Sequence, residues 1–196
     1  MWQQAEDFLS KDKYIGPLVR KYGPCSIKKR PKTKYFETLV RAIVGQQLST
    51  KAASTIYDRF STKVGRVTPE NILKARKNSL RNCGLSNAKC EYVKDLAKKV
   101  KNGELEISRL DDLVNEKIIE ELIAVKGIGK WTAEMFLMFS LARPDVFPVD
   151  DLGILRGTEK LLKRKMNSQK IGQFALRWKP HRTVACWYLW RSLNND

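Results

Sequence analysis

The chain has 196 residues, of which 42% are hydrophobic, and its 38 lysines and arginines outnumber 21 aspartates and glutamates to give a formal net charge of +17. This hydrophobic content excludes a disordered chain, and the length suits one large domain or two small lobes that share a cleft. The charge favours a polyanionic partner, most often nucleic acid, because each phosphate contact releases counterions. A merely basic ribosome-associated or thermophilic protein is the alternative.

Helical patterns dominate the chain. Thr68 is the expected N-cap of one helix with Pro69 at its first position, and Ser86 is the expected N-cap of another. Strand-like alternation is scarce, so the sequence predicts an all-α protein of about nine or ten helices. In chain order, the expected helices cover residues 35–49, 49–60 (capped by Ser49 or Thr50), 67–75, 86–103, 115–127, 130–142, 151–166 and 180–193.

Two of these helices flank a glycine-rich turn. The spacing predicts that the helix over 115–127 turns four apolar residues inward, and that the helix over 130–142 is central and buried because it is apolar nearly all round. The four inward residues are Ile118, Ile119, Leu122 and Ile123.

The cysteine pattern and the N-terminus indicate the cellular compartment and the absence of a metal site. The four cysteines show no C-x-x-C spacing, and His181 is the one histidine. We therefore expect reduced thiols in an intracellular protein, with neither a zinc site nor a four-cysteine iron–sulfur cluster. The N-terminus is too charged for a signal peptide, and no apolar run is long enough to span a membrane.

The turn Gly127-Ile128-Gly129 lies between two predicted helices. A dinucleotide-binding turn needs a preceding strand and a third glycine, and a nucleotide P-loop needs a glycine five residues earlier, so both interpretations fail. Two glycines allow close approach of a ligand, and free N–H groups at a helix start, beside Lys126 and Lys130, suit a DNA phosphate. An ordinary glycine-terminated helical hairpin is the alternative.

Two adjacent aspartates, Asp150 and Asp151, stand where the helix over 151–166 begins. Aspartate is a common N-cap, and one solvated neighbour beside a cap would explain the pair. A carboxylate near DNA faces phosphates, however, and is better explained by chemistry. In glycosidic-bond cleavage an anionic oxygen stabilises positive charge that develops on a sugar.

The segment 122–154 resembles the signature of the helix–hairpin–helix (HhH-GPD) DNA glycosylase superfamily. The motifs RAIVGQQLSTKAA (41–53), CGLSNAKCEYVKDLA (83–97) and WKPHRTVACWYLW (178–190) resemble the 3-methyladenine DNA glycosylase II branch. The resemblance implies a two-lobed helical fold with a DNA-binding cleft between the lobes. It also implies one glycosylase domain over 1–196, in the compact form, with the helix–hairpin–helix at about 115–140.

The resemblance assigns roles to individual residues. It implies that Asp151 is catalytic, with Asp150 structural or a helix cap. Bifunctional relatives place a Schiff-base lysine two residues after the second hairpin glycine, where this chain has Trp131. A monofunctional enzyme that leaves an abasic site is therefore implied.

The resemblance places Trp131 against the target base, and His181 replaces the usual aromatic after the proline and leaves base preference open. Tyr35, Phe36 and Trp178 are further pocket candidates, because the face of an aromatic ring attracts a cationic base. The DNA-backbone hairpin comprises Lys126, Gly127, Ile128, Gly129, Lys130 and Thr132. Gln47 and Leu48 are the candidate wedge, with Leu48 as a core residue and His181 as a solvent-facing residue the alternatives.

The resemblance implies a monomer that excises alkylated bases, such as 3-methyladenine, 7-methylguanine or ethenoadenine, from double-stranded DNA in base excision repair. No cofactor is required, and relatives hold a monovalent cation, Na⁺ or K⁺, through hairpin carbonyls, here those of Ile123, Val125 and Ile128. We expect an intracellular, DNA-associated protein with no membrane contact. A glycosylase for uracil or an oxidised base, and a non-catalytic DNA-binding module, are the alternatives.

Overall fold

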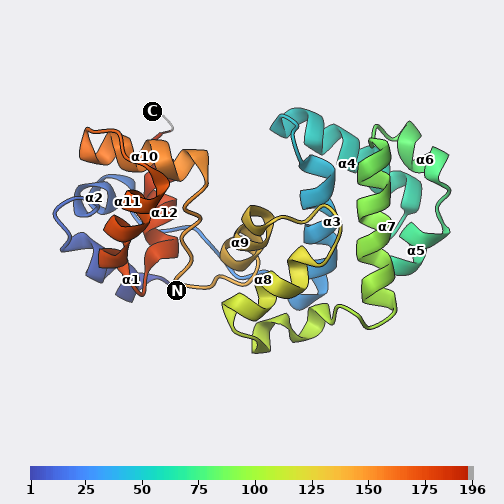
Figure 1. Cartoon of the computed structure of the whole chain (residues 1–196), viewed down its shortest axis with the longest axis horizontal. Helices are drawn as coiled ribbons and strands as arrows, with labels where there is room; N and C mark the ends of the chain where they lie inside the picture. Colours follow the sequence, from blue (N-terminus) through green and yellow to red (C-terminus); the bar gives the residue numbers. More distant parts are fainter. Residues whose placement is uncertain (194–196) are drawn as a thin grey trace. The chain divides into compact units, whose positions relative to one another are not determined.

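The computed structural model describes residues 1–193, and over that range it is all-helical, with twelve α-helices, three 3₁₀ helices and no strand (Figure 1). The predicted fold class is confirmed, but the helices outnumber the expected nine or ten because several short ones lack a long apolar period. The chain divides into two compact units. The central unit is residues 30–136, and the terminal unit is residues 1–29 together with the chain from residue 137.

The central unit is built around α7. This helix packs against α5 and α3, and α3 packs against α4 (Figure 1). The core side chains Leu39, Ile43, Phe60, Leu80 and Leu96 are almost completely buried, and each such side chain stabilises the unit by about 1.5–3 kcal/mol. The elements are η1 (Lys32–Lys34), α3 (Tyr35–Gly45), α4 (Thr50–Val64), α5 (Pro69–Lys74), α6 (Lys77–Asn82), α7 (Asn87–Lys101), η2 (Ile107–Asp112), α8 (Asn115–Ile123) and most of α9 (Lys130–Phe139).

Side-chain caps fix where three of these helices begin. The side chain of Ser49 accepts a hydrogen bond from the amide of Ala52, Thr68 does so from Asn71, and Ser86 does so from Lys89. The predicted caps are therefore confirmed, each satisfying an N–H that the first helical turn leaves open.

The terminal unit joins the two ends of the chain. Its α12 packs against α1, α2 and α10. The indole N–H of Trp2 donates to the carbonyl of Ile27 at 2.8 Å, and the hydroxyl of Tyr188 donates to the carbonyl of Gly23 at 2.9 Å. The first 29 residues are therefore part of a folded unit. Its elements are α1 (Gln3–Ser10), α2 (Gly16–Tyr22), α10 (Leu152–Leu162), α11 (Ser168–Ala175), η3 (Leu176–Trp178) and α12 (Arg182–Arg191).

Two predictions about burial need correction. Ile123 was expected to point inward but is 48% exposed, because α8 ends at that residue. The helix over 130–142 was expected to be buried, and α9 does bury Ala133, Phe136, Leu137 and Met138, but Trp131 is 49% exposed. Uniform apolar composition hides which face of a helix meets solvent. Among residues 1–193 no helix has the length and apolar character needed to cross a membrane.

Candidate active site and DNA-contact segments

The turn between α8 and α9 adopts a conformation that only glycine accommodates easily. Gly127 has a φ of +81°, and an added Cβ there would lie 2.1 Å from Cδ2 of the Tyr92 ring. At Gly129 an added Cβ would meet nothing within 4 Å. The first glycine is therefore needed for the fold of the turn, whereas the second leaves open space beside the backbone.

The backbone amides of this turn fall into two groups. The amide of Lys126 donates to Oδ2 of Asp95 at 2.9 Å, and that of Ile128 donates to the carbonyl of Val125 at 3.1 Å. Within residues 1–193 the amides of Gly127, Gly129 and Lys130 have no hydrogen-bond partner. Unpaired amides at a helix N-terminus, where the helix dipole is positive, are suited to an anion such as phosphate.

The side chains of Lys130 and Thr132 in the hairpin differ in exposure. Nζ of Lys130 lies 3.8 Å from the Glu134 carboxylate, and the lysine side chain is 60% exposed, so this surface pair contributes little to folding. Thr132 is only 7% exposed. We therefore no longer expect its hydroxyl to contact DNA.

Both candidate wedge residues lie at the surface of the central unit. Gln47 is exposed and has a φ of 57°, in the left-handed region that a residue other than glycine rarely adopts. Leu48 is 37% exposed, which argues against the alternative that it is a core residue. Their loop connects α3 to α4.

Asp151 is the N-cap of α10 and is held by two donors. Its Oδ1 accepts the amide N–H of Ile154 at 2.8 Å and the indole N–H of Trp190 at 2.9 Å. Asp150 is exposed, and of its two expected roles, structural residue or helix cap, the second is wrong, because Asp151 occupies the cap position. Two N–H groups directed at one oxygen fix the orientation of the carboxylate.

Gly153 leaves the space in which this arrangement forms. An added Cβ at position 153 would lie 2.7 Å from Cδ1 and 2.8 Å from Nε1 of Trp190, and 3.0 Å from Oδ1 of Asp151. The Trp190 ring also packs against Phe139, with centroids 5.6 Å apart. Sequence analysis missed Trp190 and Gly153, because the tryptophan lies 39 residues from the aspartate and nothing local indicates the pairing.

The five predicted pocket aromatics occupy different environments. Tyr35 and Trp178 are completely buried; the Tyr35 ring packs on Phe136, and that of Trp178 on Phe147 and Phe174. We withdraw Tyr35 and Trp178 from the pocket, since neither offers surface to a base.

The other three remain candidates. Trp131 is 49% exposed, while Phe36 and His181 are partly exposed. His181 stands at the start of α12 with its ring 5.3 Å from that of Phe8, and its buried Nδ1 has no hydrogen-bond partner among residues 1–193. The alternative of a solvent-facing His181 is therefore not supported.

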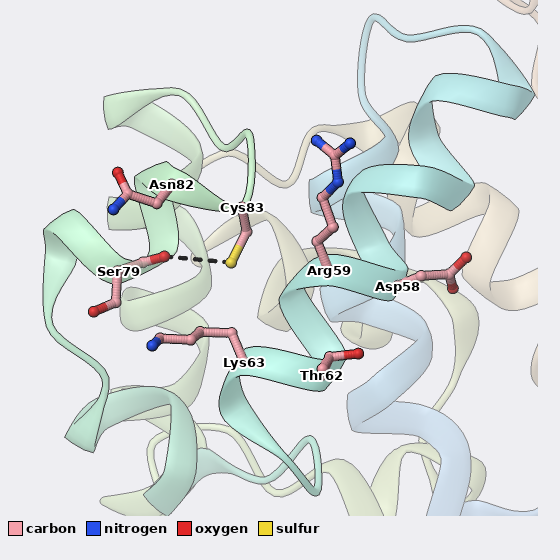
Figure 2. A pocket seen from close by; sticks show the side chains of 7 residues that line it. All are labelled: Asp58, Arg59, Thr62, Lys63, Ser79, Asn82 and Cys83. Atoms are coloured by element: carbon pink, nitrogen blue, oxygen red, sulfur yellow. Dashed lines mark hydrogen bonds between the residues drawn. The ribbon is translucent and has the colours of Figure 1, made fainter.

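A groove of about 710 Å³ opens elsewhere in the central unit, between α4 and α6 (Figure 2). None of the predicted site residues lines it. Burial raises the pKa of the Cys83 thiol, against the opposing effect of Lys63 and Arg59, so this cysteine is not an activated nucleophile. The lining residues are Asp58, Arg59, Thr62, Lys63, Ser79, Asn82 and Cys83.

Among the described residues, no group of three or more His, Cys, Asp and Glu side chains gathers as a metal-ligand set. The predicted carbonyl ligands lie at the end of α8 and in the turn. The carbonyl of Val125 already accepts the amide of Ile128, which leaves one further lone pair for a cation.

Comparison with known proteins gives a consistent result. The model of the HhH-GPD superfamily of base excision DNA repair proteins matches residues 40–181. The chain is 31% identical to the alkylbase DNA glycosidase-like protein mag2 of Schizosaccharomyces pombe, over 97% of this chain and 93% of that protein. It is 37% identical to DNA-3-methyladenine glycosylase 1 of the same organism, over 92% and 81%. The solved structure of the S. pombe 3-methyladenine DNA glycosylase Mag1 in complex with abasic DNA superposes with a TM-score of 0.88 at 35% identity, covering 99% of this chain and 98% of that one.

Proposed function

The chain belongs to the HhH-GPD superfamily of base excision DNA repair proteins, and from this premise we propose that it is a monofunctional DNA N-glycosylase for alkylated bases. It acts as a monomer on double-stranded DNA, removes 3-methyladenine and leaves an abasic site. The similarity to enzymes named DNA-3-methyladenine glycosylase supports this substrate class.

One observation carries the proposal: the carboxylate of Asp151 is fixed by two N–H donors in a chain of net charge +17. In a DNA-binding module this carboxylate would serve only as the N-cap of α10, and it would repel phosphates. A glycosylase needs one to stabilise the oxocarbenium-like sugar and to orient the attacking water.

The central unit supplies the DNA contacts. The unpaired amides of Gly127, Gly129 and Lys130 bind a backbone phosphate without reading sequence. Gln47 and Leu48 enter the base stack and fill the gap left by the flipped nucleotide. Flipping costs a few kcal/mol and is easiest for a damaged base, which contributes to selectivity.

The predicted site residues suit a positively charged base best. A base alkylated on a ring nitrogen is already a good leaving group, so no general acid is needed. Its positive charge is attracted to an aromatic face, and the half-exposed ring of Trp131 offers one. We extend the proposal to 7-methylguanine on this ground, whereas neutral ethenoadenine depends on stacking alone.

Position 131 also decides the reaction type. A lyase needs an amine to form a Schiff base with C1′ of the sugar, and tryptophan has none. Borohydride should therefore trap no covalent adduct between the protein and DNA. A trapped adduct would show that another amine serves as the nucleophile.

We further propose that Ile123, Val125 and Ile128 hold Na⁺ or K⁺ through their carbonyls. The free lone pair on the Val125 carbonyl supports this. When bound, such an ion adds positive charge next to the phosphate-binding amides. The chemical step does not involve it.

The test is base release from defined substrates. Duplex DNA methylated with methyl methanesulfonate, and duplexes with a single ethenoadenine, 8-oxoguanine or uracil, are incubated with protein, and released bases are separated by chromatography. Release of 3-methyladenine and 7-methylguanine, but not uracil, is the expected result. Release of uracil or 8-oxoguanine alone would favour the other-lesion alternative, and tight duplex binding without any release would favour a binding module.

A further inference from the structure

The loop of residues 46–48, which carries the candidate wedge, needs outside support. Gln47 has a φ of 57°, so the chain leaves α3 through a conformation that side chains other than glycine disfavour. The loop's own backbone bonds are long: the amide of Gln46 donates to Ile43 at 3.4 Å, and that of Leu48 donates to Gly45 at 3.2 Å. Hydrogen bonds to other elements add to these contacts.

Lys89 of α7 supplies part of the support. Its Nζ donates to the carbonyl of Val44 at 2.8 Å and to that of Gln46 at 2.7 Å. A cation at the C-terminus of α3 satisfies carbonyls that the last turn leaves open and suits the helix dipole. The side chain is partly buried, and burial lowers the pKa of Lys89.

Gln46 connects the same loop to the glycine turn. Its Nε2 donates to the carbonyl of Gly127 at 2.7 Å, across 81 residues of sequence. One end of this bond is next to the predicted wedge residues, and the other lies in the predicted phosphate-binding turn. A shift of either segment therefore stretches a short hydrogen bond to the other.

The same face of α7 holds the glycine turn. Residues 89, 92 and 95 recur at three-residue spacing, which places them along one side of a helix. The Tyr92 ring occupies the space that a Cβ at Gly127 would need, and the Asp95 carboxylate accepts the amide of Lys126 at 2.9 Å. Between them, three residues of one helix thus contact both segments: Lys89 contacts the loop, and Tyr92 and Asp95 contact the turn.

We propose that Lys89 and Gln46 are positioning residues that lock the wedge loop (46–48) to the glycine turn (125–129), so that both DNA contacts are fixed relative to each other before DNA binds. The inference rests on the proposed function for its purpose, though the locking itself does not require DNA. A preset pair of contacts spares the ordering of side chains and backbone on binding.

The experiment compares Gln46→Leu and Lys89→Met with the wild type and with Lys101→Met. The last variant removes the same charge from the exposed far end of α7 and serves as the matched control. Hydrogen–deuterium exchange of the DNA-free proteins is measured for peptides spanning 45–50 and 124–130. Dissociation constants are measured by fluorescence anisotropy for a duplex with a tetrahydrofuran abasic analogue and for an undamaged duplex.

We expect both segments to exchange at least tenfold faster in Gln46→Leu and Lys89→Met, and the dissociation constant for the abasic-analogue duplex to rise about 5- to 20-fold. Lys101→Met should leave exchange unchanged and affinity within about twofold. Unchanged exchange at 124–130 in Gln46→Leu, or faster exchange with unchanged affinity in folded variants, overturns the proposal. If Lys89→Met does not fold, Gln46→Leu decides alone. A wild type that binds neither duplex would remove the proposed function, while the exchange data would still test the locking.

Discussion

The two units hold their candidate functional groups by different means. In the central unit the groups are backbone amides at and just before the start of α9, which have no hydrogen-bond partner among residues 1–193. In the terminal unit the group is one side chain, Asp151, whose oxygen is fixed by a neighbouring amide and by Trp190. The first arrangement suits non-specific contact with phosphate, and the second suits chemistry at one atom.

Because of this difference, we expect DNA binding and catalysis to be impaired by different substitutions. Changes around Asp151 should slow base release and leave DNA affinity intact, whereas changes in the turn should weaken binding or folding. A variant that violates this division would show that the two units do not divide the tasks.

Asp151→Asn should give the largest effect. The amide removes the negative charge but keeps an oxygen that can accept the same two N–H donors, so the fold should persist. Single-turnover release of 3-methyladenine should slow about 100- to 1000-fold, equivalent to roughly 2.7–4 kcal/mol. The affinity for an abasic-analogue duplex should change less than about twofold; Asp150→Asn is the control, and near wild-type release by Asp151→Asn would refute the catalytic role.

Gly127→Ala should destabilise the central unit. The positive φ costs an alanine about 1–2 kcal/mol, and displacement of the Tyr92 ring adds about 1–3 kcal/mol. We therefore expect the free energy of unfolding, measured by urea denaturation, to fall by about 2–5 kcal/mol.

Gly129→Ala is the matched control for this change. An added methyl group there meets nothing within 4 Å, so stability should change by less than about 1 kcal/mol. The methyl group would still stand beside the unpaired amides, and DNA affinity should fall about threefold to tenfold. Equal stability losses in the two variants would contradict our account of the turn.

The sequence predicted the local structure of the central unit more completely than the surroundings of Asp151 in the terminal unit. Glycines, capping residues and helical periodicity are local features, and they were sufficient for the helical hairpin and for the caps at Ser49, Thr68 and Ser86. Local patterns do not say which apolar residues a helix exposes. The same composition therefore misled us about Ile123 and Trp131, which are about half exposed.

The surroundings of Asp151 depend on contacts between residues far apart in the chain. Its partner Trp190 reads from sequence as one more aromatic of an apolar helix, and Gly153 as an ordinary small residue. Similarly, Tyr35 and Trp178 look like pocket aromatics in sequence, although both are core residues. A sequence pattern identifies the residue type that the chemistry needs, but burial determines which residue of that type can contact a ligand.

Trp190→Phe should produce a moderate effect confined to chemistry. Phenylalanine keeps an aromatic ring beside Phe139 but removes the indole N–H that Asp151 accepts. A hydrogen bond to a charged group contributes about 1.5–3 kcal/mol, and about half of this should appear in the barrier, so single-turnover release should slow about tenfold. DNA affinity should be unchanged. Gly153→Ala places a methyl group against the contact between Trp190 and Asp151 and should slow release similarly. A loss of DNA affinity in Trp190→Phe would contradict a role limited to positioning Asp151.

Lys126→Met should have the smallest effect, visible mainly in salt dependence. If the turn contacts one phosphate, removal of this lysine should lower the magnitude of the slope of log K against log salt concentration by about one. Lys165→Met removes an equal charge from an exposed position of the terminal unit and should leave that slope unchanged. Equal decreases in the two variants would mean that the phosphate contacts are shared between the units, and the division between a binding unit and a catalytic unit would then hold only for the chemical step.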